Sequence, residues 1–247
     1  METTATPAPT DLATLLVGLL REPGRPRVTW YGPGGERVEL SGVVLLNWVN
    51  KTTNLLVEEF DAAPGARVRL DLPPHWRTLV WALATWRTGA GVLTSHDDGP
   101  ADVVVTHRPD AHPDASDVVA VALPALARRF DGDLPPGALD AAGAVMTYGD
   151  ALGWVAPADP AAAALTGTSH AGLLAATAGH DVAPGARVLH RVPDGPVTPD
   201  ELVLELAVLA ADGSLVLVAP GAGIDEGRVA ESERVTALGA LGARRDR

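Results

Sequence analysis

The residues best suited to chemistry lie in one short stretch, LTGTSHAGLLAATAGH, from Leu165 to His180. Three hydroxyls and an imidazole precede an Ala/Leu-rich segment that predicts a helix over about 169–178. Because a helix N-terminus carries unpaired N–H groups and a positive dipole end, this cluster favours a modest anion. The cluster consists of Thr166, Thr168, Ser169 and His170. We expect any pocket to lie beside it, and we assign no catalytic residue.

The same stretch comes close to the nucleophile motif of serine hydrolases. GTSHA, at 167–171, is one residue short of G-x-S-x-G, because Ala171 stands where the second glycine belongs. The strand that the motif requires would be AAAAL, which is poor in β-branched residues. We therefore interpret Ser169 as a helix cap, with a serine hydrolase using Ser169 as a weaker alternative.

Two other patterns are weak on inspection. Gly221, Gly223 and Gly227 follow a predicted strand, but a lone glycine pattern matches by chance too readily to indicate a dinucleotide site. Imidazoles and carboxylates gather at 96–98 and 107–117 in proline-containing loops without rigid spacing. Metal sites orient their ligands through a second layer of contacts, which such loops lack, so we expect no metal.

Composition narrows the function classes further. The formal net charge is −12, which opposes the phosphate contacts that drive nucleic-acid binding. There are no cysteines, which excludes disulfides, thiolate metal sites and a cysteine nucleophile, and fits a cytoplasmic protein. The apolar run 12–20 has no positive charge in front and is too short to span a bilayer. We interpret 11–21 as an amphipathic helix with Thr10 or Asp11 as its N-cap.

A short segment occurs twice in the chain, and we call the two copies the echoed segments. APGARVRL begins at Ala63 and APGARVLH begins at Ala183, each after a helical stretch and each followed by a proline, an apolar helix and a short apolar strand. Strands alternating with helices of this length predict βα units and a parallel sheet. We expect an α/β fold of two similar βα subdomains with largely parallel sheets, and a crevice at the carboxyl ends of the strands where the halves meet.

The predicted organisation has three parts. Residues 1–133 form a first α/β subdomain with an N-terminal helix and a hairpin in VTWYGPGGERVEL, and residues 165–247 form a second, shorter one. Residues 134–164, rich in Pro, Ala and Gly, form a linker with a helix around 138–147. Predicted helices elsewhere begin at the capping residues Ser41 and Thr198.

The segments VELSGVVLLNWVNKTTNLL, APGARVRLDLPPHWRTLVWALATWRTGAGVLTSHD and ADVVVTHRP together resemble the N-terminal part of acyl-CoA synthetases and related AMP-forming ligases. The matching positions are Leu40-Ser41, Gly65-Ala66-Arg67-Val68, Leu72-Pro73-Pro74 and Gly89-Ala90. The resemblance covers 27–108 clearly and 165–219 weakly, and it extends to short actinobacterial relatives of these ligases. It implies a fold with two similar α/β subdomains and ATP-dependent activation of an acid.

The resemblance also exposes a departure. In the ligases a Ser/Thr/Gly-rich loop ending in P-K-G wraps the ATP phosphates just before the element similar to LTGTSHAGLLAA. Here that place is held by GWVAPADPAAAA, which has no Lys, Ser or Thr and has two prolines without N–H groups. Lys51 lies on an early predicted helix and cannot replace the missing lysine, and the chain ends before the family's later motifs.

We therefore expect a degenerate, truncated ligase-like protein, a pseudoenzyme that acts as a binding or partner module without autonomous adenylation. One alternative is one half of a split acyl-CoA synthetase. No cofactor is expected, ATP, AMP and CoA esters included. Expected partners are a protein or a second copy of the chain, and a small acyl or anionic ligand, with no nucleic acid and no membrane span.

Overall fold

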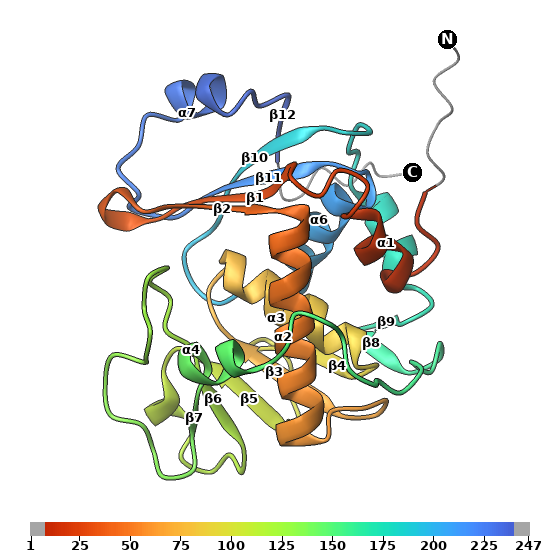
Figure 1. Ribbon diagram of the computed structural model, residues 1–247, viewed down its shortest axis with the longest axis vertical. Coiled ribbons are helices and arrows are strands. Elements are labelled where there is room, and N and C mark those ends of the chain that lie inside the picture. The colour runs from red at the N-terminus through yellow and green to blue at the C-terminus, as the bar shows by residue number, and fades with distance from the viewer. Residues whose placement is uncertain (1–7, 240–247) are drawn as a thin grey trace.

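The computed structural model describes residues 8–239 and contains two five-stranded sheets and a small hairpin (Figure 1). Sheet A has the order β12 (Ala237–Leu238), β10 (Arg187–Arg191), β11 (Ser214–Val218), β1 (Pro26–Tyr31) and β2 (Arg37–Ser41). Sheet B has the order β4 (Gly91–Thr94), β3 (Arg67–Asp71), β5 (Val103–Thr106), β6 (Val118–Ala120) and β7 (Leu139–Asp140). Every pairing in the two sheets is parallel except that of β1 with β2. The predicted α/β class with largely parallel sheets is confirmed.

Helices connect and separate the sheets. They are α1 (Leu12–Gly18), α2 (Gly42–Phe60), α3 (Trp76–Arg87), α4 (Ala141–Ala144), α5 (Leu173–Ala176), α6 (Pro199–Ala210) and α7 (Glu226–Ser232). Figure 1 shows α3 in the middle of the molecule, between the two sheets. Consistent with that position, α3 contacts β1 and β3, and all its residues from Trp76 to Trp86 are buried. Within residues 8–239, no helix is both long enough and apolar enough to cross a membrane.

Local capping explains where the main helices begin. The Asp11 carboxylate accepts a hydrogen bond from the Thr14 amide at 2.7 Å, and the Ser41 hydroxyl accepts one from the Val44 amide at 3.5 Å. The Thr198 hydroxyl accepts from the Glu201 amide at 3.2 Å. In each case a side chain satisfies an amide that has no partner within its helix. These interactions span three residues, so the sequence predicts the starts at Ser41 and Thr198 correctly, and of the two candidates Thr10 and Asp11 the cap of the first helix is Asp11.

The two echoed segments fold alike. Gly65 and Gly185 both have positive φ, at 98° and 72°, so both APG turns use a conformation that suits glycine. Each turn leads into a strand, β3 or β10, that is followed by a buried helix and a parallel partner strand. The predicted repeat of strand, helix and strand is therefore present in both sheets.

The N-terminal hairpin joins the other half of the molecule. It falls within the predicted first subdomain, yet β1 pairs with β11 in parallel, with Val28 opposite Leu215. Both strands are almost wholly buried, and they lie side by side in the interior of sheet A. The membership of the sheets therefore does not follow the predicted boundaries at 133 and 165.

The predicted linker is attached to sheet B. Strand β7 pairs with β6, and the helix expected over 138–147 is shortened to α4 plus the turn η3 (Val145–Thr147). The following backbone lies against α2, where the Asn50 side-chain amide donates to the Asp150 carbonyl at 2.7 Å. The Asn54 side-chain amide donates to the Ala151 carbonyl at 2.9 Å.

Helix α6 carries ionisable groups into the core. Glu201 and Glu205 are 0% and 1% exposed. The Glu201 carboxylate lies 2.8 Å from Nε2 of buried His190 on β10. Burial, with repulsion from Glu201 adding to it, raises the pKa of Glu205 well above the ordinary glutamate value. Burial therefore favours the neutral, protonated form of Glu205.

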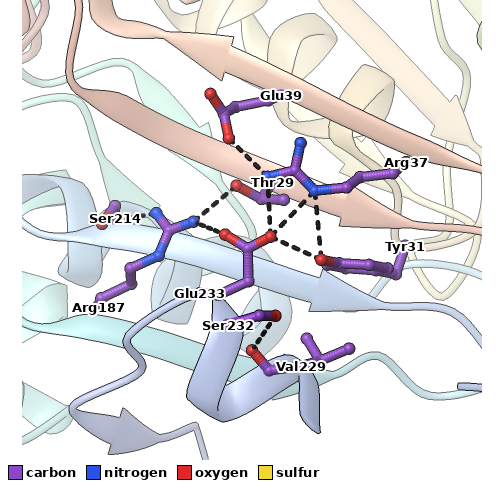
Figure 2. Close-up of polar contacts among 9 residues, drawn as sticks. All are labelled: Thr29, Tyr31, Arg37, Glu39, Arg187, Ser214, Val229, Ser232 and Glu233. Carbon is purple, nitrogen blue, oxygen red and sulfur yellow. Dashed lines mark hydrogen bonds and ion pairs between the residues drawn. The ribbon is translucent and has the colours of Figure 1, made fainter. Parts of the chain in front are cut away.

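A second polar cluster fastens α7 to the outer face of sheet A. Figure 2 shows the Glu233 carboxylate between the guanidinium groups of Arg37 and Arg187, with the Tyr31 hydroxyl beside it. Tyr31 donates to Glu233 at 2.6 Å and the Arg37 terminal nitrogen donates at 2.8 Å, while Arg187 forms an ion pair with the same carboxylate. Although burial opposes it, these hydrogen bonds lower the pKa of Glu233, so its charge is kept.

Candidate functional site

A cavity of ≈ 370 Å³ lies where the two halves meet. Its walls come from both sheets, at the carboxyl ends of β1, β3, β6, β10 and β11 and at the turn between β1 and β2. The lining residues are Trp30, Pro33, Glu36, Pro73, Pro74, His75, Leu123, Pro124, Pro193, Asp194, Ala219 and Pro220. Open α/β sheets bind ligands in this kind of crevice, and the volume lies within the usual range of about 300–1,000 Å³ for small-molecule sites. The cavity is therefore the candidate site.

The walls of the cavity are poor in hydrogen-bond donors. Six of the twelve lining residues are prolines, which have no N–H. Two of the remaining amides are already bonded within the chain: Glu36 donates to the Pro33 carbonyl and Ala219 donates to the Tyr31 carbonyl. None of the described residues that line the cavity is Lys or Arg. A polyphosphate would find few partners here.

His75 forms the floor of the cavity next to Trp30. Its Nδ1 accepts the Arg77 amide at 3.1 Å, which caps α3 and places the ring proton on Nε2. Burial, with the Arg77 charge adding to it, lowers the pKa of His75 to about 3, so the ring is neutral. The His75 and Trp30 ring centroids are 4.3 Å apart in an edge-to-face arrangement, which is favourable for aromatic rings.

Glu36 closes the cavity by joining the two halves. One carboxylate oxygen accepts the Trp30 indole N–H at 2.9 Å, and the other accepts the Ala125 amide at 2.6 Å. Trp30 lies on β1 of sheet A, whereas Ala125 follows β6 of sheet B. Sequence analysis missed Glu36 and His75, because the available signal was no more than a glutamate in a Gly-rich turn and a histidine after two prolines.

The predicted cluster at 166–170 lies elsewhere. Strand β8 (Ala163–Leu165) pairs with β9 (Thr168–Ser169) in an antiparallel hairpin beside β4, and the Thr166 hydroxyl bonds to Asp97 at the carboxyl end of that strand. The structure keeps the cluster together but puts it at the β4 edge of sheet B. None of its four residues lines the cavity.

Ser169 is engaged in local structure. It lies in β9, and its hydroxyl accepts the Gly172 amide at 3.2 Å, which caps the turn leading into α5. The helix expected over 169–178 is reduced to Leu173–Ala176, because residues 168 and 169 pair with β8 instead. A nucleophile elbow needs a strained strand-to-helix turn at the serine, and Ser169 does not have positive φ.

The stretch that takes the place of the phosphate loop, 153–164, runs into β8, whose hairpin with β9 closes tightly. Residues 166 and 167 alone join β8 to β9, with Gly167 at φ 71°. The preceding stretch folds on itself around Asp159, whose carbonyl accepts the Ala162 amide at 3.1 Å. Lys51 lies 3.1 Å from the Asp150 carboxylate and also donates to the Tyr148 carbonyl, so it fastens residues 148–150 to α2.

The His/Asp loops surround a buried aspartate. Asp71, at the end of β3, accepts hydrogen bonds from Ser95, Thr106 and Arg108, and its carboxylate lies 2.9 Å from Nε2 of His112. Burial opposes ionisation, but these contacts lower the pKa of Asp71, so it is charged. Within the described part of the chain, no group of three or more His, Cys, Asp or Glu side chains could hold a metal ion.

Comparison with known proteins identifies a relative of this chain. No family model matches it. A TIGR03089 family protein from Mycobacterium tuberculosis (strain ATCC 25618 / H37Rv) is 38% identical over 244 residues, covering 92% of this chain and 98% of the relative. The chain belongs to the TIGR03089 family.

The fold of this TIGR03089 protein is similar to that of solved ligase structures. A Brucella canis acyl-CoA synthetase superposes with a TM-score of 0.69 at 18% identity, covering 91% of this chain and 46% of the synthetase. Acetoacetyl-CoA synthetase from Streptomyces lividans gives 0.68 at 17% identity, covering 92% and 41%, and apo MatB from Rhodopseudomonas palustris gives 0.63 at 18%, covering 91% and 48%. At these identities the likeness shows the fold. It matches the N-terminal part of acyl-CoA synthetases, and the chain spans under half of each of these three proteins.

Proposed function

We infer that this protein is a binding or partner module that keeps the crevice of the ligase fold but does not adenylate an acid on its own. The observation that carries this proposal is the stretch 153–164, where the resemblance places the phosphate loop: it has no Lys, Ser or Thr, and its last two residues already lie in β8, which pairs with β9. Without a lysine or a hydroxyl side chain, this stretch offers three phosphates few hydrogen-bond partners.

The electrostatics of this region support the same proposal. Residues 153–170 contain no Lys or Arg, and the carboxylate of Asp159 lies among them. Charge-assisted hydrogen bonds contribute about 1.5–3 kcal/mol each, so the loss of a lysine and several amide donors reduces triphosphate affinity by orders of magnitude. The cavity itself contains two carboxylates, Glu36 and Asp194, and no lysine or arginine among the described lining residues.

Pyrophosphate exchange tests this proposal. The purified chain, incubated with ATP, labelled pyrophosphate and a panel of carboxylic acids, should give exchange no higher than a reaction without protein. A full-length acyl-CoA synthetase serves as the positive control. Acid-dependent exchange by the purified chain would refute the proposal. A thermal-shift screen of nucleotides, CoA esters and fatty acids identifies ligands independently of turnover, because binding to the folded state raises stability.

A specific observation favours the second candidate, one half of a split acyl-CoA synthetase. Trp154 is 78% exposed and Met146 is 57% exposed, and both follow sheet B in segments that pack on α2. Large apolar side chains that are exposed in this way often mark a protein interface. This candidate requires a second polypeptide to supply the nucleotide site.

Affinity purification of the tagged chain from its source organism tests the split-ligase candidate. A retained polypeptide that restores pyrophosphate exchange on mixing would establish it, and that complex should weaken in a Trp154→Ser variant. Val17→Ser, at an exposed apolar residue on α1, is the matched control. Light scattering of the purified chain shows whether a second copy acts as the partner instead.

A further inference from the structure

The cavity at the carboxyl ends of the strands also indicates the charge of its ligand, an inference that rests on the proposed binding function. An anionic head group needs N–H or cationic partners to replace its hydration. Half of the lining residues are prolines, the amides of Glu36 and Ala219 are bonded within the chain, and the Trp30 indole N–H is bonded to Glu36. The walls therefore offer an anion few free donors, of which the Nε2–H of His75 is one.

The charges around the cavity favour the opposite sign. Asp194 lies exposed at the rim and bonds to the adjacent Gly195 amide, so its carboxylate remains accessible to a ligand. The guanidinium of Arg77 lies behind the wall, where it donates to the Pro124 and Ala125 carbonyls and stacks 4.3 Å from the Trp76 ring centroid. Arg77 is 8% exposed and does not line the cavity. It offsets the charge of Glu36 but leaves that of Asp194.

The N-terminus of α3 is the feature that could favour an anion. Its dipole points toward the cavity, because His75 is both the residue before the helix and part of the cavity floor. The Arg77 amide at this end is already bonded to His75 Nδ1, and the neutral imidazole supplies no positive charge. The helix end therefore contributes less than an open, uncapped terminus does.

We propose that the cavity binds a small apolar molecule with a positively charged head, such as a protonated aryl-alkyl amine, in preference to a carboxylate or phosphate. The prolines, Leu123 and the Trp30 ring surround the apolar body. Asp194 pairs with the ammonium group at the rim. This selectivity is opposite to that of a site built to hold a carboxylic acid.

Three probes that share one aromatic body test the preference: phenethylamine, phenethyl alcohol and phenylacetate, titrated into the full chain by calorimetry at low ionic strength. An exposed ion pair adds modestly to affinity, so we expect the amine to bind about ten-fold more tightly than the carboxylate, with the alcohol between them. Equal or tighter binding of phenylacetate overturns the inference. Absence of any binding also overturns it, while the exchange assay continues to test the proposed function separately.

Three variants distinguish binding in the cavity from binding to the acidic surface of the chain. Asp194→Asn should reduce the preference for the amine about five-fold, whereas Asp114→Asn, at an exposed carboxylate in another loop, should leave it unchanged. Ala219→Leu adds bulk to the lining and should weaken all three probes together, provided that its circular dichroism spectrum matches that of the parent. Equal effects of the two Asp substitutions would show diffuse binding of cations to a chain of net charge −12 and would overturn the inference.

Discussion

Removal of the Glu36 carboxylate should loosen the junction between the two halves of the molecule. Glu36→Ala deletes the acceptor of the Trp30 indole N–H and of the Ala125 amide, the two contacts that tie the β1–β2 turn to the segment after β6. Trp30 is 4% exposed, so its N–H loses a partner in a nearly buried position. Two charge-assisted bonds at about 1.5–3 kcal/mol each set an upper bound of about 6 kcal/mol. Because Glu36 is half-buried and water reaches the cavity, we expect a loss of about 2–4 kcal/mol.

Urea unfolding measures this loss as a change in midpoint at constant slope. Glu39→Ala is the matched control, because Glu39 lies on the same hairpin and pairs with Arg37 at the surface, where a salt bridge contributes about 0–1 kcal/mol. Glu36→Gln should lose nearly as much as Glu36→Ala, since its amide NH₂ would face one of the two N–H donors. If Glu36→Ala and Glu39→Ala destabilise the chain equally, Glu36 does not join the halves.

Three further predictions concern other polar groups. The raised pKa of Glu205 means that the folded chain keeps a proton that the unfolded chain releases, so its contribution to stability is complete below the unfolded pKa and is lost as the pH rises through the folded pKa. Glu205→Gln should therefore gain stability relative to the parent as the pH rises above the ordinary glutamate pKa, measured by urea unfolding. A stability difference between variant and parent that does not change with pH would contradict a raised pKa for Glu205. Glu233→Gln should speed hydrogen exchange of the α7 amides more than Glu231→Gln, at an exposed position of the same helix, because it weakens the contacts with Arg37 and Arg187. Ser169 should remain unmodified by a fluorophosphonate probe, since its hydroxyl caps a turn, and covalent labelling would reopen the hydrolase alternative.

Much of the fold follows from patterns that act within a few residues. The caps at Asp11, Ser41 and Thr198 and the paired APG turns are present as predicted. The short segments after 138 and 169 were harder to predict. Their Ala-rich composition favours helix, but pairing with β6 and β8 uses the residues at their N-terminal ends. Tertiary contacts therefore shortened two helices that intrinsic propensity extended.

The candidate site was predicted in kind but not in place. A crevice at the strand ends follows from a parallel α/β sheet, and the cavity lies there. Its lining residues come from six separate segments, and only Pro73 and Pro74 belong to a position that the resemblance singles out. The cluster at 166–170 was a candidate because its hydroxyl and imidazole side chains are common in binding and catalytic sites. In the structure the Thr166 hydroxyl bonds to Asp97, and the Ser169 hydroxyl accepts from the Gly172 amide.

By itself, the sequence determined the α/β class, the repeated unit of strand, helix and strand, the helix starts and the absence of cations from 153–170, because each depends on neighbours or on composition. The tertiary structure alone decided that the N-terminal hairpin joins sheet A, that Glu36 joins the two halves and that burial favours the neutral form of Glu205. An apolar strand fits many partners equally well, and its choice among them is made by the packing of the whole chain.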